Sequence, residues 1–480
     1  MVLSSSLSQL RLSPRYWQRL NLQHYSGADI FEALFAADKI ATLLESPGHV
    51  DGASQDLIRY SLCAGGPQNS EGQLHLFTPE IGEILTTLNQ LLKYGQQSSL
   101  VASASPDVPP EYLPFLGGWL GWLGFDTAWE IETLPYLNPD SLPFPVAYWY
   151  EPEEFAILDH QQQDLWLAAT TQSGLVAMAK RITAYQSHSH NDYSPRQGTS
   201  RITFCSDQHQ FETAIQTAKD YIRAGDVFQV NLSLRFHTET HSSPWKLYRQ
   251  LHTINPSPFS SYWCTPWGQV ISCSPERLVQ LQRDTAQTRP IAGTRPRGNT
   301  PVQDRSLAKT LQNNHKERAE HIMLVDLERN DLGRVCTWGS IEVNELMVIE
   351  RYSHVMHLVS NVIGTLQPNL NAVDLIRATF PGGTITGCPK VRCMEIIEAL
   401  EPVRRSLFYG SCGYLDRRGQ LDLNILIRTL LLAPINTHTH QVWGQVGAGI
   451  VADSDPHQEW LESLQKAKAQ LLALGVGLES

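Results

Sequence analysis

The sequence predicts an α+β fold, in which strands and helices are mixed without the regular pattern of a dinucleotide-binding domain. The second half of the chain alternates strand-like and helix-like segments, and the first half holds short strand-like runs. No G-x-G-x-x-G motif follows a predicted strand. With 480 residues, of which 42% are hydrophobic and 18% charged, the chain can bury a large core.

In the first half, strands are predicted at Ala147–Tyr150 and Leu165–Ala169. The segment LPFLGGWLGWLGFD, residues 113–126, alternates bulky residues with glycines, which is typical of closely packed backbone in a buried sheet. The polar stretch Tyr185–Ser200 has no apolar periodicity and is predicted to be an exposed linker.

The second half contains longer elements, and the last of them carries its own start signal. Asp455 can cap a helix that begins at Pro456, with Gln458 at the capping-box position. The other elements are helices at Phe211–Ala224 and Ser306–Leu332 and strands at Val227–Phe236, Ile341–Ile349 and Leu423–Leu432.

Composition excludes several classes of function. The net charge is −11 and no basic stripe stands out, so nucleic acid is not the expected partner. The eight cysteines are scattered without a C-x-x-C pair, which supports neither a zinc site nor a disulfide framework. No signal peptide or membrane-spanning stretch is recognisable, so a cytoplasmic protein without membrane partners is expected.

The segment FPGGTITGCPK, residues 380–390, is the most informative loop. Its glycines allow a ligand to approach the backbone, and Pro389 is placed to be the first residue of a helix in which Val391, Met394 and Ile397 face the core. A Gly/Thr loop before a helix N-terminus can present N–H groups to an anion. An ordinary tight loop is the alternative.

Several charged side chains point to the same kind of ligand. Glu459, Glu462 and Lys466 share one stripe of the terminal helix, and Glu317 and Glu320 lie one turn apart on an earlier helix. Carboxylates from two helices that face one pocket would suit Mg²⁺, which also takes water and ligand oxygens. The alternative is a solvated acidic helix face.

Two further features concern buried polar groups. Arg428 lies in an apolar run that predicts a buried strand, and a buried arginine needs an anionic partner. His354 and His357 end another strand-like run, where a satisfied core histidine is the plain interpretation. The glycine-containing segment Val446–Ile450 offers backbone to a ligand. Together these residues suit an anionic, oxygen-rich ligand bridged by Mg²⁺.

A long, ordered series of motifs runs from Phe211 to Leu474. In this region the chain resembles the chorismate-utilising enzymes, specifically component I of aminodeoxychorismate synthase and of anthranilate synthase. The motifs are Gln229–Ser233, Ser274–Arg277, Arg289–Thr294, Lys316–Glu320, Val325–Gly333, Tyr352–Ser360, residues 380–390, Ile427–Thr429 and Gly447–Asp453. Earlier segments resemble the N-terminal region of the same enzymes more loosely.

The resemblance implies a fold and a domain organisation. It implies two large, mostly antiparallel sheets packed as a sandwich with helices outside. It implies an N-terminal region at residues 15–185, a linker at 186–205 and a chorismate-binding catalytic domain at 206–475. It also implies a separate glutamine amidotransferase subunit that supplies ammonia, because no amidotransferase module is evident in the chain.

The resemblance also implies a role for individual residues. Glu276, His357 and Lys466 correspond to catalytic residues, with Glu276 as the acid that faces the departing hydroxyl of chorismate. Mg²⁺ is the expected cofactor. The remaining correspondences are Glu320, Glu459 and Glu462 around the metal, and Thr294, Thr384, Gly387, Tyr414, Arg428, Gly447, Ala448, Gly449 and Lys466 around the substrate.

Two products remain open, and a non-catalytic homologue is a third alternative that the intact site residues oppose. Gln229 replaces the lysine of relatives that add water, which argues against isochorismate formation. Ala292 is typical of anthranilate synthases, whereas many aminodeoxychorismate synthases have a nucleophilic lysine there. Asn231, the segment Asn255–Ser260 and the loop Gly382–Thr386 favour aminodeoxychorismate synthase, although Leu44-Glu-Ser46 keeps part of a tryptophan-site pattern.

Overall fold

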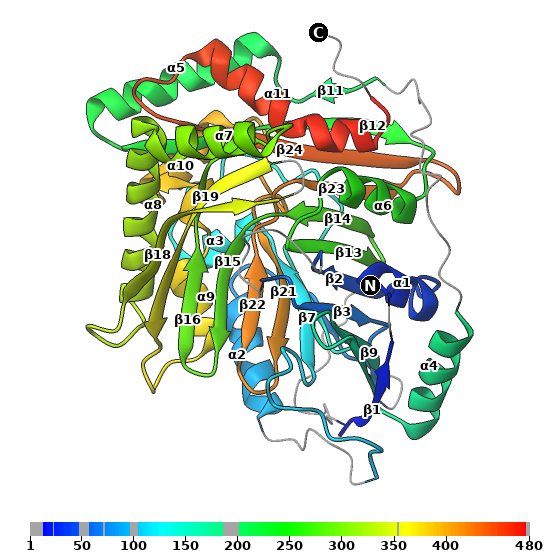
Figure 1. The fold of residues 1–480 in the computed structure, drawn as a ribbon. Helices are drawn as coiled ribbons and strands as arrows, with labels where there is room; N and C mark the ends of the chain where they lie inside the picture. Colours follow the sequence, from blue (N-terminus) through cyan, green and yellow to red (C-terminus); the bar gives the residue numbers. More distant parts are fainter. Residues whose placement is uncertain are drawn as a thin grey trace.

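Two large antiparallel sheets form the centre of the protein and helices cover their outer faces, which confirms the predicted architecture (Figure 1). The structure is a computed structural model that describes residues 13–22, 24–47, 57–70, 73–96, 104–185, 201–352 and 355–476. Most of the predicted linker and His354 lie outside the described residues.

The larger sheet combines strands from both halves of the chain. Within the described residues it has 12 strands, and β20 (Gly387–Cys388) pairs with the first two residues of β12. The order is β1 (Tyr16–Asn21), β10 (Asp164–Ala169), β9 (Glu154–Asp159), β3 (Tyr60–Ala64), β2 (Ala41–Glu45), β13 (Phe259–Thr265), β14 (Gly268–Ser274), β23 (Thr429–Pro434), β24 (His440–Ile450), β12 (Gln229–Thr240) and β11 (Thr203–Phe204).

The smaller sheet is also shared between the two halves. In the described part of the chain it has 10 strands, with β18 (Glu342–Arg351) paired to β19. The order is β17 (Ile291–Pro296), β19 (Val355–Thr365), β16 (Thr285–Arg289), β15 (Arg277–Gln282), β22 (Leu421–Asn424), β21 (Ser411–Asp416), β7 (Gly118–Leu123), β8 (Ala147–Tyr150) and β6 (Leu76–Phe77), and a separate ribbon joins β4 (Asn69–Ser70) and β5 (Gln73–Leu74).

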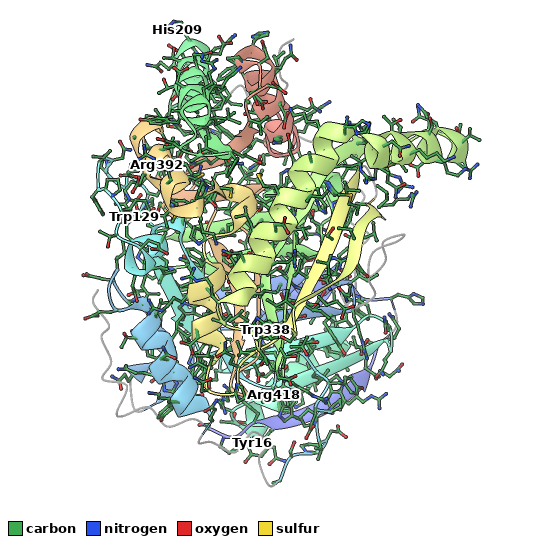
Figure 2. The ribbon with its side chains drawn as sticks, turned by 90° about the vertical axis from the view of Figure 1, so that its left-hand side faces the viewer. Tyr16, Trp129, His209, Trp338, Arg392 and Arg418 are labelled. Carbon is green, nitrogen blue, oxygen red and sulfur yellow. The ribbon has the colours of Figure 1, made fainter. Side chains whose placement is uncertain are left out.

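The helices lie outside the sheets, and α5 and α11 lie together at one end of the molecule in both views (Figures 1 and 2). None of the helices in the described segments has the length and apolar run needed to cross a membrane. The helices are α1 (Gly27–Leu34), α2 (Ile84–Gly95), α3 (Ala128–Ile131), α4 (Gln172–Ala184), α5 (Gln208–Ala224), α6 (Pro244–Ile254), α7 (Pro301–Asn313), α8 (His315–Gly333), α9 (Ala372–Thr379), α10 (Lys390–Leu400) and α11 (Pro456–Ala473), with short 3-10 turns η3 (Phe125–Thr127) and η4 (Gly383–Ile385).

The main core lies between the two sheets and is rich in tryptophan. Trp122 of β7 meets Trp263 of β13 edge to face, with ring centroids 5.8 Å apart, so the contact joins the two sheets. Gly121 has no room for a side chain, because a Cβ atom there would lie 2.1 Å from the Tyr148 carbonyl oxygen. The prediction of closely packed backbone in the segment 113–126 is therefore confirmed. A second core fills the space between the larger sheet and helices such as α1, α5, α6 and α11.

Helix signals in the sequence are largely confirmed. The Asp455 carboxylate accepts the Gln458 N–H at 2.9 Å, and Pro456 is the first residue of α11. The predicted helix at Ser306–Leu332 is two helices, because Asn314 ends α7 and caps α8. Pro389 precedes the first residue of α10 as its N-cap, and Val391 is 37% exposed and does not face the core.

The prediction of one strand over Leu423–Leu432 is wrong. Strand β22 belongs to the smaller sheet and β23 to the larger one, so residues 425–428 cross between the sheets. Their hydrogen bonds follow this crossing, since Ile425 N–H donates to the Glu276 carbonyl and Leu426 N–H to the Gly410 carbonyl. Arg428 has a φ of 53°, in the left-handed region. Arg428 therefore lies in a break between two strands.

Candidate functional site

A cavity of about 190 Å³ lies where β12 and β24 of the larger sheet face β17 and β19 of the smaller sheet. The crossing segment 425–428 and the loop around η4 close two further sides. Seven of the residues singled out from the sequence line this cavity: Glu276, Thr294, His357, Thr384, Arg428, Gly447 and Lys466.

The alternation of side chains along β12 explains why this interior space is polar. Val230, Leu232 and Leu234 point into the core beneath the helices. Asn231 points the opposite way and lines the cavity. In the paired strand β24, the glycine at 447 keeps the wall thin, since a Cβ atom there would lie 2.8 Å from the Tyr409 hydroxyl. The strands thus present polar groups and bare backbone to a ligand.

Arg428 supplies a positive charge to the cavity. Burial lowers the pKa of this guanidinium, and no carboxylate in the described part of the chain forms an ion pair with it. A charge without a protein partner in a largely enclosed space is costly. The planar guanidinium can bind a carboxylate through two hydrogen bonds, so an anionic ligand would complete the site.

His357 is held as a neutral side chain beside Arg428. It is 4% exposed, and its Nδ1 lies 3.0 Å from the Thr294 hydroxyl. Burial, with a smaller contribution from the Arg428 charge, lowers its pKa to about 4. At neutral pH the imidazole can therefore exchange hydrogen bonds with a ligand without carrying a charge.

Glu276 is an acid with a raised pKa. Its side chain is 5% exposed, and the Ile291 N–H donates to its carboxyl group at 3.4 Å. Burial raises its pKa to about 7, although the Thr384 hydroxyl and the Ile291 N–H act in the opposite direction. A substantial fraction of Glu276 is therefore protonated at neutral pH, as a general acid requires.

The loop at 380–390 contributes through its own residues and not through the helix behind it. Thr384 and Ile385 line the cavity, whereas no residue of α10 does. The Thr386 side chain faces inward and donates to the Gly382 carbonyl at 2.8 Å, which stabilises the turn. The N-terminus of α10 therefore lies outside this cavity, and only the loop before it borders the space.

Lys466 connects the cavity to a group of carboxylates. Its ammonium donates to the Gly447 carbonyl at 3.0 Å and lies 2.8 Å from the Glu462 carboxylate. Burial would raise the pKa of Glu462, but the Lys466 charge lowers it below its usual value. Burial raises the pKa of Glu320, and negative charge on Glu459 and Glu462 raises it further. Helices α8 and α11 thus bring these three carboxylates toward one another.

These carboxylates fit a partial metal site. Within the described residues, no cluster of three or more His, Cys, Asp or Glu side chains is arranged to hold a metal ion by itself. Mg²⁺ usually takes one or two carboxylates and keeps waters or ligand oxygens. Glu320 and Glu462 could hold such an ion if a ligand in the cavity supplied further oxygens, and Glu459 would lie beside them.

Four of the expected substrate residues do not line this cavity. Ala448 is fully buried in the core on the other face of β24. Gly387 and Gly449 lie against Gln229, so a Cβ atom on Gly387 would meet the Gln229 carbonyl and one on Gly449 would meet its side chain. Tyr414 is in a different place, because β21 directs its ring against Phe115 and into a second cavity.

The second cavity, of about 120 Å³, lies near the N-terminal strands. It brings Leu44, Glu45 and Ser46, which keep part of a tryptophan-site pattern, together with Phe259 and Ser260 of the segment that favours aminodeoxychorismate synthase. Tyr414 therefore belongs to this second cavity in the structure, and its assignment to the substrate site is corrected.

Sequence reasoning missed several residues of the first cavity. Tyr409 and Gln445 line it but belong to none of the charge patterns or motifs, and Ile291 lies in the motif Arg289–Thr294 without a predicted role. Tyr409 lines the cavity and has a φ of 63°, in the left-handed region. No spacing or charge pattern in the sequence marks this residue.

Comparisons with known proteins agree with this geometry. Residues 68–472 match the family model described as chorismate binding enzyme. The chain is 59% identical over 471 residues to an anthranilate synthase component I-like protein from Synechocystis sp., covering 97% of this chain and 93% of the relative. It is 45% identical over 379 residues to aminodeoxychorismate synthase component 1 from Bacillus subtilis, covering 77% and 79%.

A solved structure shows the same fold. Anthranilate synthase component I from Streptococcus pneumoniae superposes with a TM-score of 0.71 at 31% identity, covering 88% of this chain and 94% of the other. The family match spans most of the chain, and the cavity holds an unpaired arginine, a neutral histidine and a protonatable glutamate. The protein is therefore an enzyme that belongs to the chorismate-binding family.

Proposed function

We propose that the protein aminates chorismate with ammonia to give 4-amino-4-deoxychorismate, a precursor of para-aminobenzoate. The observation that carries this proposal is the convergence of Arg428, Glu276 and His357 in one cavity, because chorismate combines carboxylates with a departing hydroxyl. Mg²⁺ at Glu320 and Glu462 and a glutamine amidotransferase partner complete the proposal. A carboxylate of chorismate binds Arg428, and Lys466 is placed to neutralise another.

The net reaction can be written with these residues. The ring C–O bond breaks as Glu276 donates its proton, and the hydroxyl leaves as water. A C–N bond forms from the lone pair of ammonia, and the nitrogen then loses a proton, which restores the acid. His357, held by Thr294, stays neutral and orients the departing group. When bound, Mg²⁺ would neutralise a carboxylate of chorismate. Because Ala292 lies in the cavity wall, no lysine adduct forms at that position.

Identity to relatives does not separate the branches, because the 45% identical B. subtilis relative is named aminodeoxychorismate synthase component 1 and the 59% identical Synechocystis relative is named anthranilate synthase component I-like. Two local features favour the aminodeoxychorismate branch. The loop Gly382–Thr386, of which Thr384 and Ile385 line the cavity, and Asn231 of β12, which also lines it, both resemble that branch in sequence. Ala292 favours the alternative, anthranilate synthase component I, which forms anthranilate and pyruvate.

One assay separates the two products. Purified protein is incubated with chorismate, Mg²⁺ and ammonium at alkaline pH, where more ammonia is unprotonated. We expect a product that yields para-aminobenzoate only after a separate lyase is added. Fluorescent anthranilate with an equal amount of pyruvate would contradict the proposal and establish the alternative. A chorismate-dependent thermal shift of zero, with no product, would contradict both.

A further inference from the structure

Arg405 lies behind the cavity and contacts two of its walls. Its side chain is 2% exposed, in the segment that follows α10. The Nη1 group donates to the Ile385 carbonyl at 2.7 Å, and Nη2 donates to the Asn231 carbonyl at 2.8 Å. Ile385 and Asn231 both line the cavity, one from the η4 loop and the other from β12. A single guanidinium therefore joins the loop to the larger sheet.

The position of the guanidinium is fixed by Glu401, four residues earlier, at the C-cap of α10. Its Nε and Nη2 groups donate to the Glu401 carboxylate at 3.0 and 2.7 Å. The same carboxylate accepts the backbone N–H and the hydroxyl of Ser233, at 2.8 and 2.7 Å. Ser233 lies between the part of β12 that pairs with β20 and the part that pairs with β11. No strand accepts its backbone N–H on that side, and the Glu401 carboxylate takes this place.

The face of the guanidinium supports a third wall. Its central carbon lies 4.6 Å from the centre of the Tyr409 ring and 4.7 Å from that of Phe125. Tyr409 lines the cavity with a positive φ, a conformation that its surroundings must stabilise. Arg405 thus contacts all three elements that set the width of the cavity on this side: the η4 loop, β12 and the Tyr409 segment.

We propose that Arg405 is a positioning residue of the chorismate reaction, which acts through Ile385, Asn231 and Tyr409 to hold the η4 loop at its working distance from β12. The inference rests on the proposed function only in taking chorismate as the substrate. Thr384 precedes Ile385 and faces Glu276, so a shift of this loop would also displace the acid from the substrate. Lysine cannot replace the planar fork, because it cannot donate in these fixed directions at once.

The chain supplies a matched control in the preceding residue. Arg404 is 1% exposed and forms an ion pair with Asp126 at 2.9 Å. Its guanidinium lies between the rings of Trp129 and Tyr136, at 4.1 and 3.8 Å. It is as buried as Arg405, but its two terminal nitrogen atoms have no hydrogen-bond partner among the described residues, and neither Asp126 nor the two rings line the cavity. Its replacement should therefore change stability without displacing a wall of the cavity.

The test compares Arg405→Lys with Arg404→Lys, measuring unfolding temperature, KM for chorismate and kcat under ammonium-dependent turnover. We expect about a 10²-fold loss of kcat/KM only in Arg405→Lys, whatever each variant's fall in unfolding temperature, because misplacing a site by about 1 Å has this effect. KM for chorismate in Arg404→Lys should stay within about twofold of the wild type, because Asp126, Trp129 and Tyr136, the partners of Arg404, do not line the cavity.

A second pair of variants guards against misfolding. Glu401→Gln keeps the size of the side chain but removes the charge, and we expect it to raise KM in the same direction as Arg405→Lys.

Added methylguanidinium should restore part of the turnover of Arg405→Ala and none of that of Arg404→Ala. If the wild type converts chorismate but the two lysine variants show equal changes in KM, the inference about Arg405 is overturned and the proposed function is not. A wild-type protein that neither binds nor converts chorismate would instead overturn the proposed function.

Discussion

The Thr294 hydroxyl lies 3.0 Å from Nδ1 of His357, and the two side chains join neighbouring strands of the smaller sheet. The pairing of Thr294 with His357 across β17 and β19 is therefore both a backbone register and a side-chain contact. Because burial keeps the imidazole neutral, this contact determines which nitrogen faces the cavity. The orientation of His357 depends on a residue that touches the substrate space itself.

Replacing Thr294 by valine tests this orientation. The change keeps the shape of the side chain but removes the hydroxyl, and we expect kcat to fall up to about tenfold, since a hydrogen bond contributes about 1 kcal/mol. Thr294→Ser should retain most of the activity. Steady-state kinetics with chorismate measure both variants. Equal rates for the valine and serine variants would show that the contact does not orient His357.

The raised pKa of Glu276 gives a prediction on both rate and stability. As an acid, Glu276 must be protonated, so turnover should decline as the pH rises through about 7, apart from the gain in free ammonia. The pKa of about 7 in the folded protein exceeds the ordinary value of 4.5. The folded state therefore holds this proton more tightly, and the stability it contributes is present below pH 4.5 and lost as the pH rises through 7.

Glu276→Gln separates these two effects. We expect it to abolish turnover and yet to be more stable than the wild type at pH 8, by up to about 3 kcal/mol, the free energy equivalent of the raised pKa. At pH 5 the two proteins should differ little. Urea unfolding at both pH values measures the difference. A variant that is less stable than the wild type at pH 8 would contradict the burial argument.

A second buried carboxyl group lies behind the same loop. Glu328 of α8 is 6% exposed, and its Oε1 atom would lie 3.6 Å from a Cβ atom on Gly383. Burial is the main cause that raises the pKa of Glu328. The negative charges of Asp331 and Glu276 raise this pKa further, and the positive charge of Lys390 lowers it. Lys390 forms an ion pair with Asp331 at 2.6 Å. The coupling between Glu276 and Glu328 is reciprocal.

Glu328→Gln should therefore shift the alkaline limb of the pH–rate profile to lower pH. Ionised Glu328 favours the proton on Glu276, and the neutral glutamine removes this effect at alkaline pH. The profile of kcat/KM between pH 6 and 9 is the measurement, with Asp326→Asn on the exposed face of the same helix as the control. An unchanged limb would show that the two carboxyl groups titrate independently.

Periodicity and motifs in the sequence predicted much of the fold and part of the site, for reasons that particular residues make clear. The Asp455 cap is a local signal, so the first residue of α11, Pro456, could be predicted from the sequence. The run from Leu423 to Leu432 could not be interpreted correctly, because its apolar residues serve two different sheets and only long-range pairing decides where the strand breaks. Arg428 was nevertheless identified, since a charge in an apolar run is informative wherever the strand ends.

The sequence did not predict two residues that shape the cavity, and it assigned a third residue to the wrong cavity. Tyr409 reaches the cavity through a positive φ that no sequence spacing announces. Arg405 acts through two backbone carbonyl groups, which leave no trace in residue types. Tyr414 was assigned by resemblance alone, and the direction of its side chain depends on the pairing of β21 with β7. The places of all three side chains depend on tertiary contacts that the sequence pattern does not contain.

Glu462→Gln tests the proposed metal site. The change removes a charge beside Lys466 while preserving volume, and we expect turnover to be lost because Mg²⁺ loses a carboxylate. Calorimetric titration of Mg²⁺ in the presence of chorismate should detect the loss independently of activity. Glu395→Gln, in a glutamate paired with Arg392 on α10, is the control and should bind normally. Normal Mg²⁺ dependence in Glu462→Gln would refute the assignment.

The second cavity yields a prediction about tryptophan. Its charged groups are already paired within the protein, since Arg277 donates twice to Asp422 at 2.8 Å and the Glu45 carboxylate accepts the Ala28 N–H at 2.8 Å. A zwitterionic amino acid would find these partners occupied, and Phe259 and Ser260 replace the Tyr-Met that feedback-inhibited anthranilate synthases usually have.

We therefore expect millimolar L-tryptophan to leave turnover and unfolding temperature unchanged. Ser260→Met, at a side chain that is 1% exposed and donates to the Ser257 carbonyl at 2.8 Å, provides the comparison. If tryptophan inhibits the wild type strongly, Arg277 must leave Asp422, or Glu45 must leave the Ala28 N–H, to bind the ligand. The anthranilate branch would then be favoured. If neither protein responds, the existing partners of Arg277 and Glu45 are enough to exclude the amino acid.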